Sequence, residues 1–270
     1  MNRYSHGRIT LDYKRLGNGP KAILAFHGFG RNPDDWQVFQ DVLGPKWCIY
    51  SFRLFYHGED SDLDPYIPLG FEEWSSYLDA FFEEMEIQDA VLMGYSMGGR
   101  LIFGCLEHLS TPICGAILLA PDGIIPNTWY RFLSGTRIGR MIFRHSMRSP
   151  GMYLGIARTL ASLGFIPDHR YRLFAENTEQ DHQRDRLLNT WLFLSRLMYT
   201  PEVSTRLVIE KGLSDNLHVV GGRRDRVITT KGLRAWPFLR TNPSRLHELD
   251  LGHRLMNREV ANYVRTYLLP

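Results

Sequence analysis

A serine framed by glycines is the feature of this sequence with the clearest chemical meaning. Ser96 lies in the segment 94–99 (GYSMGG), after a short apolar run, 90–93, and before a helix-like stretch, 100–109. The spacing G-x-S-x-G between a strand and a helix is typical of a nucleophile elbow, a tight turn that raises the serine hydroxyl at the end of the strand. Glycines two residues before and after the serine make room for this turn, because side chains there would collide. We therefore expect Ser96 to act as a nucleophile.

A serine nucleophile needs a general base and a group that orients that base. His253 follows the last predicted strand, 246–249, and Asp225 follows the strand before it, 217–220. Both residues thus lie at the carboxyl ends of strands, where open α/β sheets gather their ligands. The chain order serine, aspartate, histidine is also the usual order for a nucleophile elbow. We predict that Ser96, Asp225 and His253 are the catalytic residues.

Each of these assignments has a simpler alternative, and for Ser96 it is a small residue at a tight turn. Asp225 could cap a helix or pair with a neighbouring arginine, and His253 could be a surface or capping histidine. Asp122, in the segment 121–123 (PDG) after the predicted strand 113–119, is the leading rival for the acidic residue, although its setting is also typical of a turn. Asp225 is preferred, and the choice between the two aspartates stays open.

The elements that must position these residues alternate between apolar strands and amphipathic helices. The run 22–26 is continuously apolar, as expected for a strand covered on both faces of a sheet. The alternation predicts an α/β protein with a doubly wound, mostly parallel sheet, and 8–13 as an antiparallel edge strand. The further predicted strands are 47–52, 90–93, 113–119, 217–220 and 246–249; the predicted helices are 36–43, 71–85, 100–109, about 203 onward, 230–239 and 258–268.

These motifs together resemble the α/β-hydrolase fold proteins that carry a helical cap. Five segments match in the family's order: 27–30 (HGFG), 57–61 (HGEDS), 94–99 (GYSMGG), 222–227 (GRRDRV) and 252–253 (GH). The resemblance covers roughly 21–121 and 203–268, whereas the segment between them resembles no particular member. It implies an α/β-hydrolase core at 1–122 and 203–270, with 123–202 inserted as a helical cap.

The resemblance also implies a role for each matching residue. Ser96 would attack a carbonyl carbon while His253 takes its proton, and Asp225 would orient the imidazole ring. The backbone N–H groups of Phe29 and Met97 would form the oxyanion hole. His27 would support the oxyanion loop and His57 would shape a loop after a strand. Some members of the fold carry their acidic residue at the position of Asp122.

The reaction implied is acyl transfer to water. Relatives that open epoxides or displace halide carry aspartate at the nucleophile position, where this chain has Ser96. We predict a serine hydrolase that cleaves an ester or thioester of a small-to-medium apolar acyl group through an acyl-enzyme. A C–C bond hydrolase, lyase, amidase or perhydrolase at the same site stays open, as does a ligand-binding member without turnover.

The inserted segment is rich in arginine and aromatic residues. Between residues 126 and 200 there are eleven arginines, no lysine and five acidic residues. Amphipathic helices with arginine outside explain this composition most simply. The functional alternatives are a basic, apolar-lined entrance for the acyl substrate or a surface that contacts anionic lipid, with 137–148 as the best place. Nucleic-acid binding is not expected, because no recognised binding fold accompanies the arginines.

Composition sets the remaining expectations. A chain of 270 residues with 44% hydrophobic residues and a net charge of +3 is an ordinary globular protein. No signal peptide and no transmembrane run is expected, and Cys48, Cys105 and Cys114 are expected to be buried free thiols, which favours a cytoplasmic location. No metal site and no cofactor is expected, since histidines and cysteines do not cluster at ligand spacing. The oligomeric state stays open.

Overall fold

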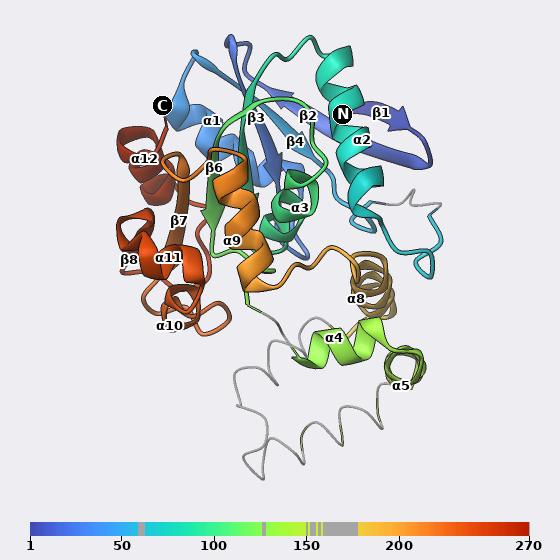
Figure 1. Cartoon of the computed structure of the whole chain (residues 1–270). Helices are drawn as coiled ribbons and strands as arrows, with labels where there is room; N and C mark the ends of the chain where they lie inside the picture. Colours follow the sequence, from blue (N-terminus) through green and yellow to red (C-terminus); the bar gives the residue numbers. More distant parts are fainter. Residues whose placement is uncertain are drawn as a thin grey trace. The chain divides into compact units, whose positions relative to one another are not determined.

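A computed structural model describes residues 1–58, 63–125, 128–149 and 178–269, together with residues 151, 155 and 158. The chain forms two compact units, which we call the sheet unit and the helical unit (Figure 1). The sheet unit comprises Met1–Ser61, Gly70–Pro126 and Leu197–Pro270, and the helical unit comprises Asp62–Leu69 and Asn127–Arg196. The division into core and cap at residues 123 and 202 stays a prediction.

The sheet unit holds one eight-stranded sheet in the order β1-β2-β4-β3-β5-β6-β7-β8. β1 pairs with β2 and β2 with β4 in antiparallel fashion, and all other pairs are parallel. This mostly parallel α/β sheet confirms the predicted fold class. The strands are β1 (Asn2–His6), β2 (Ile9–Leu16), β3 (Lys21–Phe26), β4 (Trp47–Phe52), β5 (Ala90–Tyr95), β6 (Ile113–Leu119), β7 (Leu217–Gly222) and β8 (Leu246–Leu249).

The prediction of the antiparallel edge strand was wrong in one respect. The segment predicted at 8–13 is antiparallel, but it belongs to β2, and the edge of the sheet is β1. A tight turn at Gly7, whose φ is +58°, joins the two strands into a hairpin. β1 is mostly exposed and polar, so it lacks the apolar alternation from which the other strands were predicted.

Helices cover both faces of this sheet (Figure 1). On one face α1 contacts α12, and on the other face α3 contacts α2 and α9. The predicted helix at 230–239 is in fact two short helices, because Pro237 has no N–H to continue a helix and begins the second one. The helices of the sheet unit are η1 (Pro33–Trp36), α1 (Gln37–Leu43), α2 (Phe71–Glu84), α3 (Met97–Leu106), α9 (Pro201–Glu210), α10 (Thr230–Arg234), α11 (Pro237–Thr241), η2 (Pro243–Arg245) and α12 (Arg258–Tyr267).

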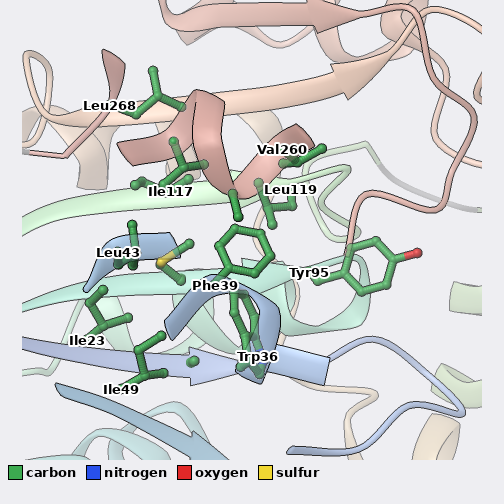
Figure 2. Packing of buried hydrophobic residues seen from close by; sticks show 14 of the residues in the cluster. Ile23, Trp36, Phe39, Leu43, Ile49, Tyr95, Ile117, Leu119, Val260 and Leu268 are labelled. Carbon is green, nitrogen blue, oxygen red and sulfur yellow. The ribbon is translucent and has the colours of Figure 1, made fainter. Parts of the chain in front are cut away.

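Successive side chains of the central strands point alternately into two apolar layers, one on each face of the sheet. In β3, Ile23 and Ala25 join a cluster with the side chains of α1 and α12 (Figure 2). Phe26 points to the opposite layer, where its ring lies 5.7 Å from the ring of Phe52 and 5.7 Å from that of Trp74. Because successive side chains of a strand point to opposite faces, a strand covered on both sides must be apolar throughout.

The helical unit contains α4 (Thr128–Gly135), α5 (Arg137–Arg148) and α8 (Asp181–Phe193). The Tyr130 hydroxyl donates a hydrogen bond to the backbone oxygen of Trp191 at 2.9 Å, and the rings of Phe143 and Trp191 lie 5.4 Å apart. These contacts join the three helices into one packed unit. No helix in the described part of the chain is both long and apolar enough to cross a membrane.

Candidate active site

Ser96 lies at the sharp turn between β5 and α3. Its backbone has φ +50° and ψ −112°, a conformation that an L-residue adopts only when its surroundings hold it there. Three hydrogen bonds hold it. The Ser96 N–H donates to the Leu119 oxygen at 2.9 Å, and the Ser96 carbonyl accepts from the N–H groups of Gly99 at 3.0 Å and Asp122 at 2.8 Å.

The glycines around Ser96 allow close backbone approaches. A Cβ on Gly98 would lie 2.1 Å from the backbone oxygen of Phe26, and a Cβ on Gly94 would lie 2.7 Å from the backbone carbon of Gly98. A Cβ on Gly99 would lie 2.5 Å from Pro121 Cβ. Real side chains do not tolerate such distances, so the turn requires glycine at positions 94 and 98, as expected, and also at position 99.

The three predicted catalytic side chains form one hydrogen-bonded chain. The Nε2 atom of His253 lies 3.2 Å from Ser96 Oγ, and its Nδ1 atom lies 2.7 Å from Asp225 Oδ2. A carboxylate can only accept a hydrogen bond, so the imidazole proton lies on Nδ1, the atom that faces Asp225. The Nε2 atom is then unprotonated and can accept the proton of the Ser96 hydroxyl. This is the geometry that a serine nucleophile with a histidine base requires.

Asp225 itself is held rigidly. Its side chain has 0% of its surface exposed. The Oδ1 atom accepts the backbone N–H groups of Val227 at 2.7 Å and Ile228 at 2.9 Å, which leaves Oδ2 for His253. A buried carboxylate with every oxygen engaged fixes the orientation of the imidazole ring.

Asp122 has different partners. It forms an ion pair with Arg100 of α3, a side chain that is almost fully buried, and it accepts the backbone N–H of Gly123 at 2.8 Å. The aspartate within hydrogen-bond distance of His253 is Asp225. The geometry thus favours Asp225 over Asp122 as the partner of the histidine.

Tyr95 is a site residue that the sequence analysis missed. Its hydroxyl donates a hydrogen bond to the backbone oxygen of His253 at 2.9 Å. Burial raises the pKa of the Tyr95 hydroxyl to about 12, so it stays a neutral donor. No sequence pattern points to this contact, because the hydroxyl bonds to a backbone oxygen, which any residue at position 253 would offer.

Two histidines organise the loop that carries Phe29. The Nε2 atom of His57 accepts the N–H of Gly30 at 2.9 Å, and its Nδ1 atom donates to the backbone oxygen of Phe55 at 2.8 Å. The Nδ1 atom of His27 donates to the backbone oxygen of Gly28 at 2.7 Å, and its Nε2 atom accepts a backbone N–H at 3.1 Å. Burial lowers the pKa of His27 well below its ordinary value, so this ring stays neutral. Both rings hold the backbone of this region in place through hydrogen bonds, which agrees with the structural role that the resemblance implies.

The two predicted oxyanion donors come from different segments, Met97 from the start of α3 and Phe29 from the loop after β3. Met97 is the first residue of α3, where helix N–H groups have no partner within the helix. Phe29 lies in the loop tied by His57. Neither backbone N–H has an acceptor among the residues that the structure describes. Both groups are therefore available to a developing oxyanion, and that role stays a prediction.

The cysteines and histidines of the described ranges were compared with the requirements of a metal site. Within the described ranges, no group of three or more His, Cys, Asp or Glu side chains is arranged to hold a metal ion. All three cysteines are free; Cys48 and Cys105 are buried as predicted, whereas Cys114 is only half-buried. Burial raises the pKa of the Cys105 thiol to about 12, so it is an unreactive packing residue.

The family of the chain follows from a comparison with known protein families. The model of the alpha/beta hydrolase family matches residues 23–265, which include all the predicted site residues. The chain therefore belongs to the α/β-hydrolase family.

Similar proteins support the same fold. The chain is 27% identical over 115 residues to the dihydrolipoyllysine-residue acetyltransferase component of the acetoin cleaving system of Cupriavidus necator, a match that covers 43% of this chain and 30% of that protein. A thermophilic esterase from Thermogutta terrifontis superposes with a TM-score of 0.66 and 19% identity, over 96% of this chain and 93% of the esterase. A thioesterase domain from the curacin biosynthetic pathway superposes with a TM-score of 0.60 and 16% identity, over 100% and 98% of the two chains.

Proposed function

We propose that this protein is a serine hydrolase that cleaves an ester or thioester of a small-to-medium apolar acyl group. The observation that carries the proposal is the hydrogen-bonded chain from Ser96 Oγ through His253 to the buried carboxylate of Asp225. Membership of the α/β-hydrolase family supports it, because a nucleophile elbow followed by aspartate and histidine serves acyl transfer in that fold.

In the first half of the reaction the substrate acylates the enzyme. Ser96 Oγ forms a bond to the carbonyl carbon while its proton passes to His253 Nε2, and Asp225 stabilises the resulting imidazolium. The negative charge on the carbonyl oxygen would be held by the N–H groups of Phe29 and Met97. The bond to the leaving oxygen or sulfur then breaks, and His253 returns the proton to the leaving group.

In the second half water releases the acyl group. His253 Nε2 takes a proton from a water molecule as the water oxygen attacks the acyl carbon. The bond to Ser96 Oγ breaks, and the proton on the ring passes to the serine oxygen. The products are a carboxylic acid and the regenerated enzyme.

The expectation of an apolar acyl group rests on how the oxyanion donors act. Phe29 and Met97 would bind through their backbones, so their apolar side chains are free to contact the acyl group. The similar folds of an esterase and of a thioesterase domain support the choice of an ester or thioester as the substrate.

Free thiols at Cys48, Cys105 and Cys114 support a reducing compartment, and we propose the cytoplasm.

Pre-steady-state kinetics test this proposal. The full chain is mixed with p-nitrophenyl esters of increasing acyl length and, in parallel, with acyl-coenzyme A thioesters. We expect a burst of p-nitrophenol that approaches one equivalent of enzyme, and a fall in kcat of at least about 10³-fold in Ser96→Ala. A folded wild-type protein that turns over none of these substrates, or turnover that persists in Ser96→Ala, would contradict the proposal.

A further inference from the structure

Helix α5 of the helical unit exposes a row of apolar side chains. Ile138 is 64% exposed, Met141 66% and Ile142 43%. Residues spaced by three and four positions lie on one face of an α-helix, so these three side chains form a single stripe. Three large apolar side chains on one exposed helix face are costly in water unless something covers them.

The opposite face of α5 is fixed by packing, which directs the stripe outward. Phe143 and Met147 are buried, and the ring of Phe143 lies 5.4 Å from that of Trp191 in α8. A Cβ on Gly139 would lie 1.9 Å from the backbone oxygen of Phe132, so α5 lies directly against α4. The stripe cannot turn inward without breaking these contacts.

A row of arginines borders the apolar stripe. The four arginines of α5 are spaced so that they gather along one side of the helix: Arg137, Arg140, Arg144 and Arg148. From Gly123 to Pro167 the sequence holds six arginines and no aspartate or glutamate. No carboxylate of the described chain forms an ion pair with an arginine of α5; Arg144 instead lies over the ring of Tyr66, 4.2 Å from its centre.

We propose that this face of α5 docks on an anionic lipid surface. An apolar stripe beside a row of arginines is the pattern of a helix that lies in the membrane interface, with the apolar side chains among the lipid tails and the guanidinium groups on the phosphates. The charge of the row matches an anionic headgroup. A nucleic acid would match the arginines but would leave Ile138 and Met141 in water. The proposal goes beyond the hydrolase activity and does not depend on it.

Vesicle binding tests the docking surface. The full chain is mixed with phosphatidylcholine vesicles that contain either no anionic lipid or about 30% phosphatidylglycerol, and bound protein is separated by flotation. We expect binding to the anionic vesicles only, and binding that weakens as salt rises from about 50 to 500 mM.

Two pairs of substitutions separate the two parts of the surface. Each arginine near an anionic surface strengthens binding about fivefold, so Arg137→Gln with Arg148→Gln should weaken vesicle binding about 25-fold. Ile138→Gln with Met141→Gln should weaken it at least about tenfold by removing the inserted side chains. Ile209→Gln, at a 58% exposed position on α9, is the matched control and should bind like the wild type.

Each outcome decides the proposal. Loss of binding in both α5 double variants, with hydrolysis of a water-soluble ester unchanged, supports docking through α5. Absence of binding to anionic vesicles, equal binding to neutral vesicles, or full binding by both double variants would overturn it. Tighter binding to a single-stranded RNA oligonucleotide than to the anionic vesicles would overturn it in favour of a nucleic-acid surface. Failure of ester hydrolysis alone would contradict the proposed function and leave this result intact.

Discussion

The hydroxyl of Tyr95 donates a hydrogen bond to the backbone oxygen of His253 at 2.9 Å, which ties the residue before the nucleophile to the loop of the predicted base. The Tyr95 ring belongs to the apolar cluster between the sheet, α1 and α12, and its hydroxyl points away from that cluster (Figure 2). The two rings lie 5.5 Å apart. Tyr95 therefore links the packing of the sheet to the position of the His253 imidazole.

Removing this hydroxyl tests Tyr95 as a positioning residue. Tyr95→Phe keeps the buried ring and deletes only the hydrogen bond, which is worth about 0.5–1.5 kcal/mol. We expect kcat to fall about three- to tenfold with KM unchanged, because the histidine is less well held while the substrate contacts remain. Rates are normalised to the folded fraction. A fall in stability with an unchanged kcat would show that the contact serves packing alone.

The two candidate acidic residues can be separated by turnover. Asp225→Asn keeps the size of the side chain but favours the wrong histidine tautomer, so kcat should fall about 10³–10⁴-fold. Asp122→Asn removes the charge that pairs with Arg100, so it should lower the free energy of unfolding by about 1–3 kcal/mol and leave most of the turnover. Full activity in Asp225→Asn with loss of activity in Asp122→Asn would reverse the assignment.

The turn around Ser96 has no room for a side chain at position 98, so a substitution of this glycine should destabilise the fold. A Cβ at Gly98 meets the backbone oxygen of Phe26 at 2.1 Å, so Gly98→Ala should lower the free energy of unfolding by about 2–3 kcal/mol. Gly135 ends α4 with nothing within 4 Å of the added atom, so Gly135→Ala should change stability by less than about 0.5 kcal/mol. Urea unfolding of both variants provides the measurement; equal stabilities would show that the turn has room for a side chain.

A histidine pair between β7 and β8 predicts how stability depends on pH. The Nδ1 atom of His218 lies 3.1 Å from Nε2 of His247, and burial, with the charges of His247 and Arg245, lowers the pKa of His218 to about 4. Between about pH 6.5 and pH 4 the unfolded chain binds a proton at this residue that the folded chain does not, so stability falls as the pH falls. His218→Gln should make this fall shallower. Parallel stability curves for the two proteins over that range would contradict the prediction.

Much of the fold and of the candidate site could be predicted because apolar runs, glycines and the order of residues along the chain each carry a signal. Continuous apolar runs such as 22–26 predicted the strands that are covered on both faces. The glycines around Ser96 predicted its turn, since the close approach of Phe26 leaves no room for a side chain. The order of the three residues in the chain, and their positions after strands, were enough to predict that Asp225 and His253 lie beside Ser96.

The parts that could not be predicted depend on contacts without a local signal. β1 forms because a hairpin at Gly7 pairs it with β2, and its polar sequence shows no buried face. The bond from Tyr95 to His253 joins residues 158 positions apart. The ion pair of Asp122 with Arg100 likewise requires the packing of α3 against the end of β6. Sequence spacing alone does not encode such tertiary contacts.

The most direct test of the account is covalent labelling of Ser96. The full chain is incubated with a fluorophosphonate, which reacts with activated serines, and the modified peptide is identified by mass spectrometry. We predict one adduct, on Ser96, that is absent in Ser96→Ala and forms much more slowly in His253→Ala. A folded wild-type protein that remains unlabelled, or an adduct that persists in Ser96→Ala, would contradict the claim that Ser96 is the nucleophile.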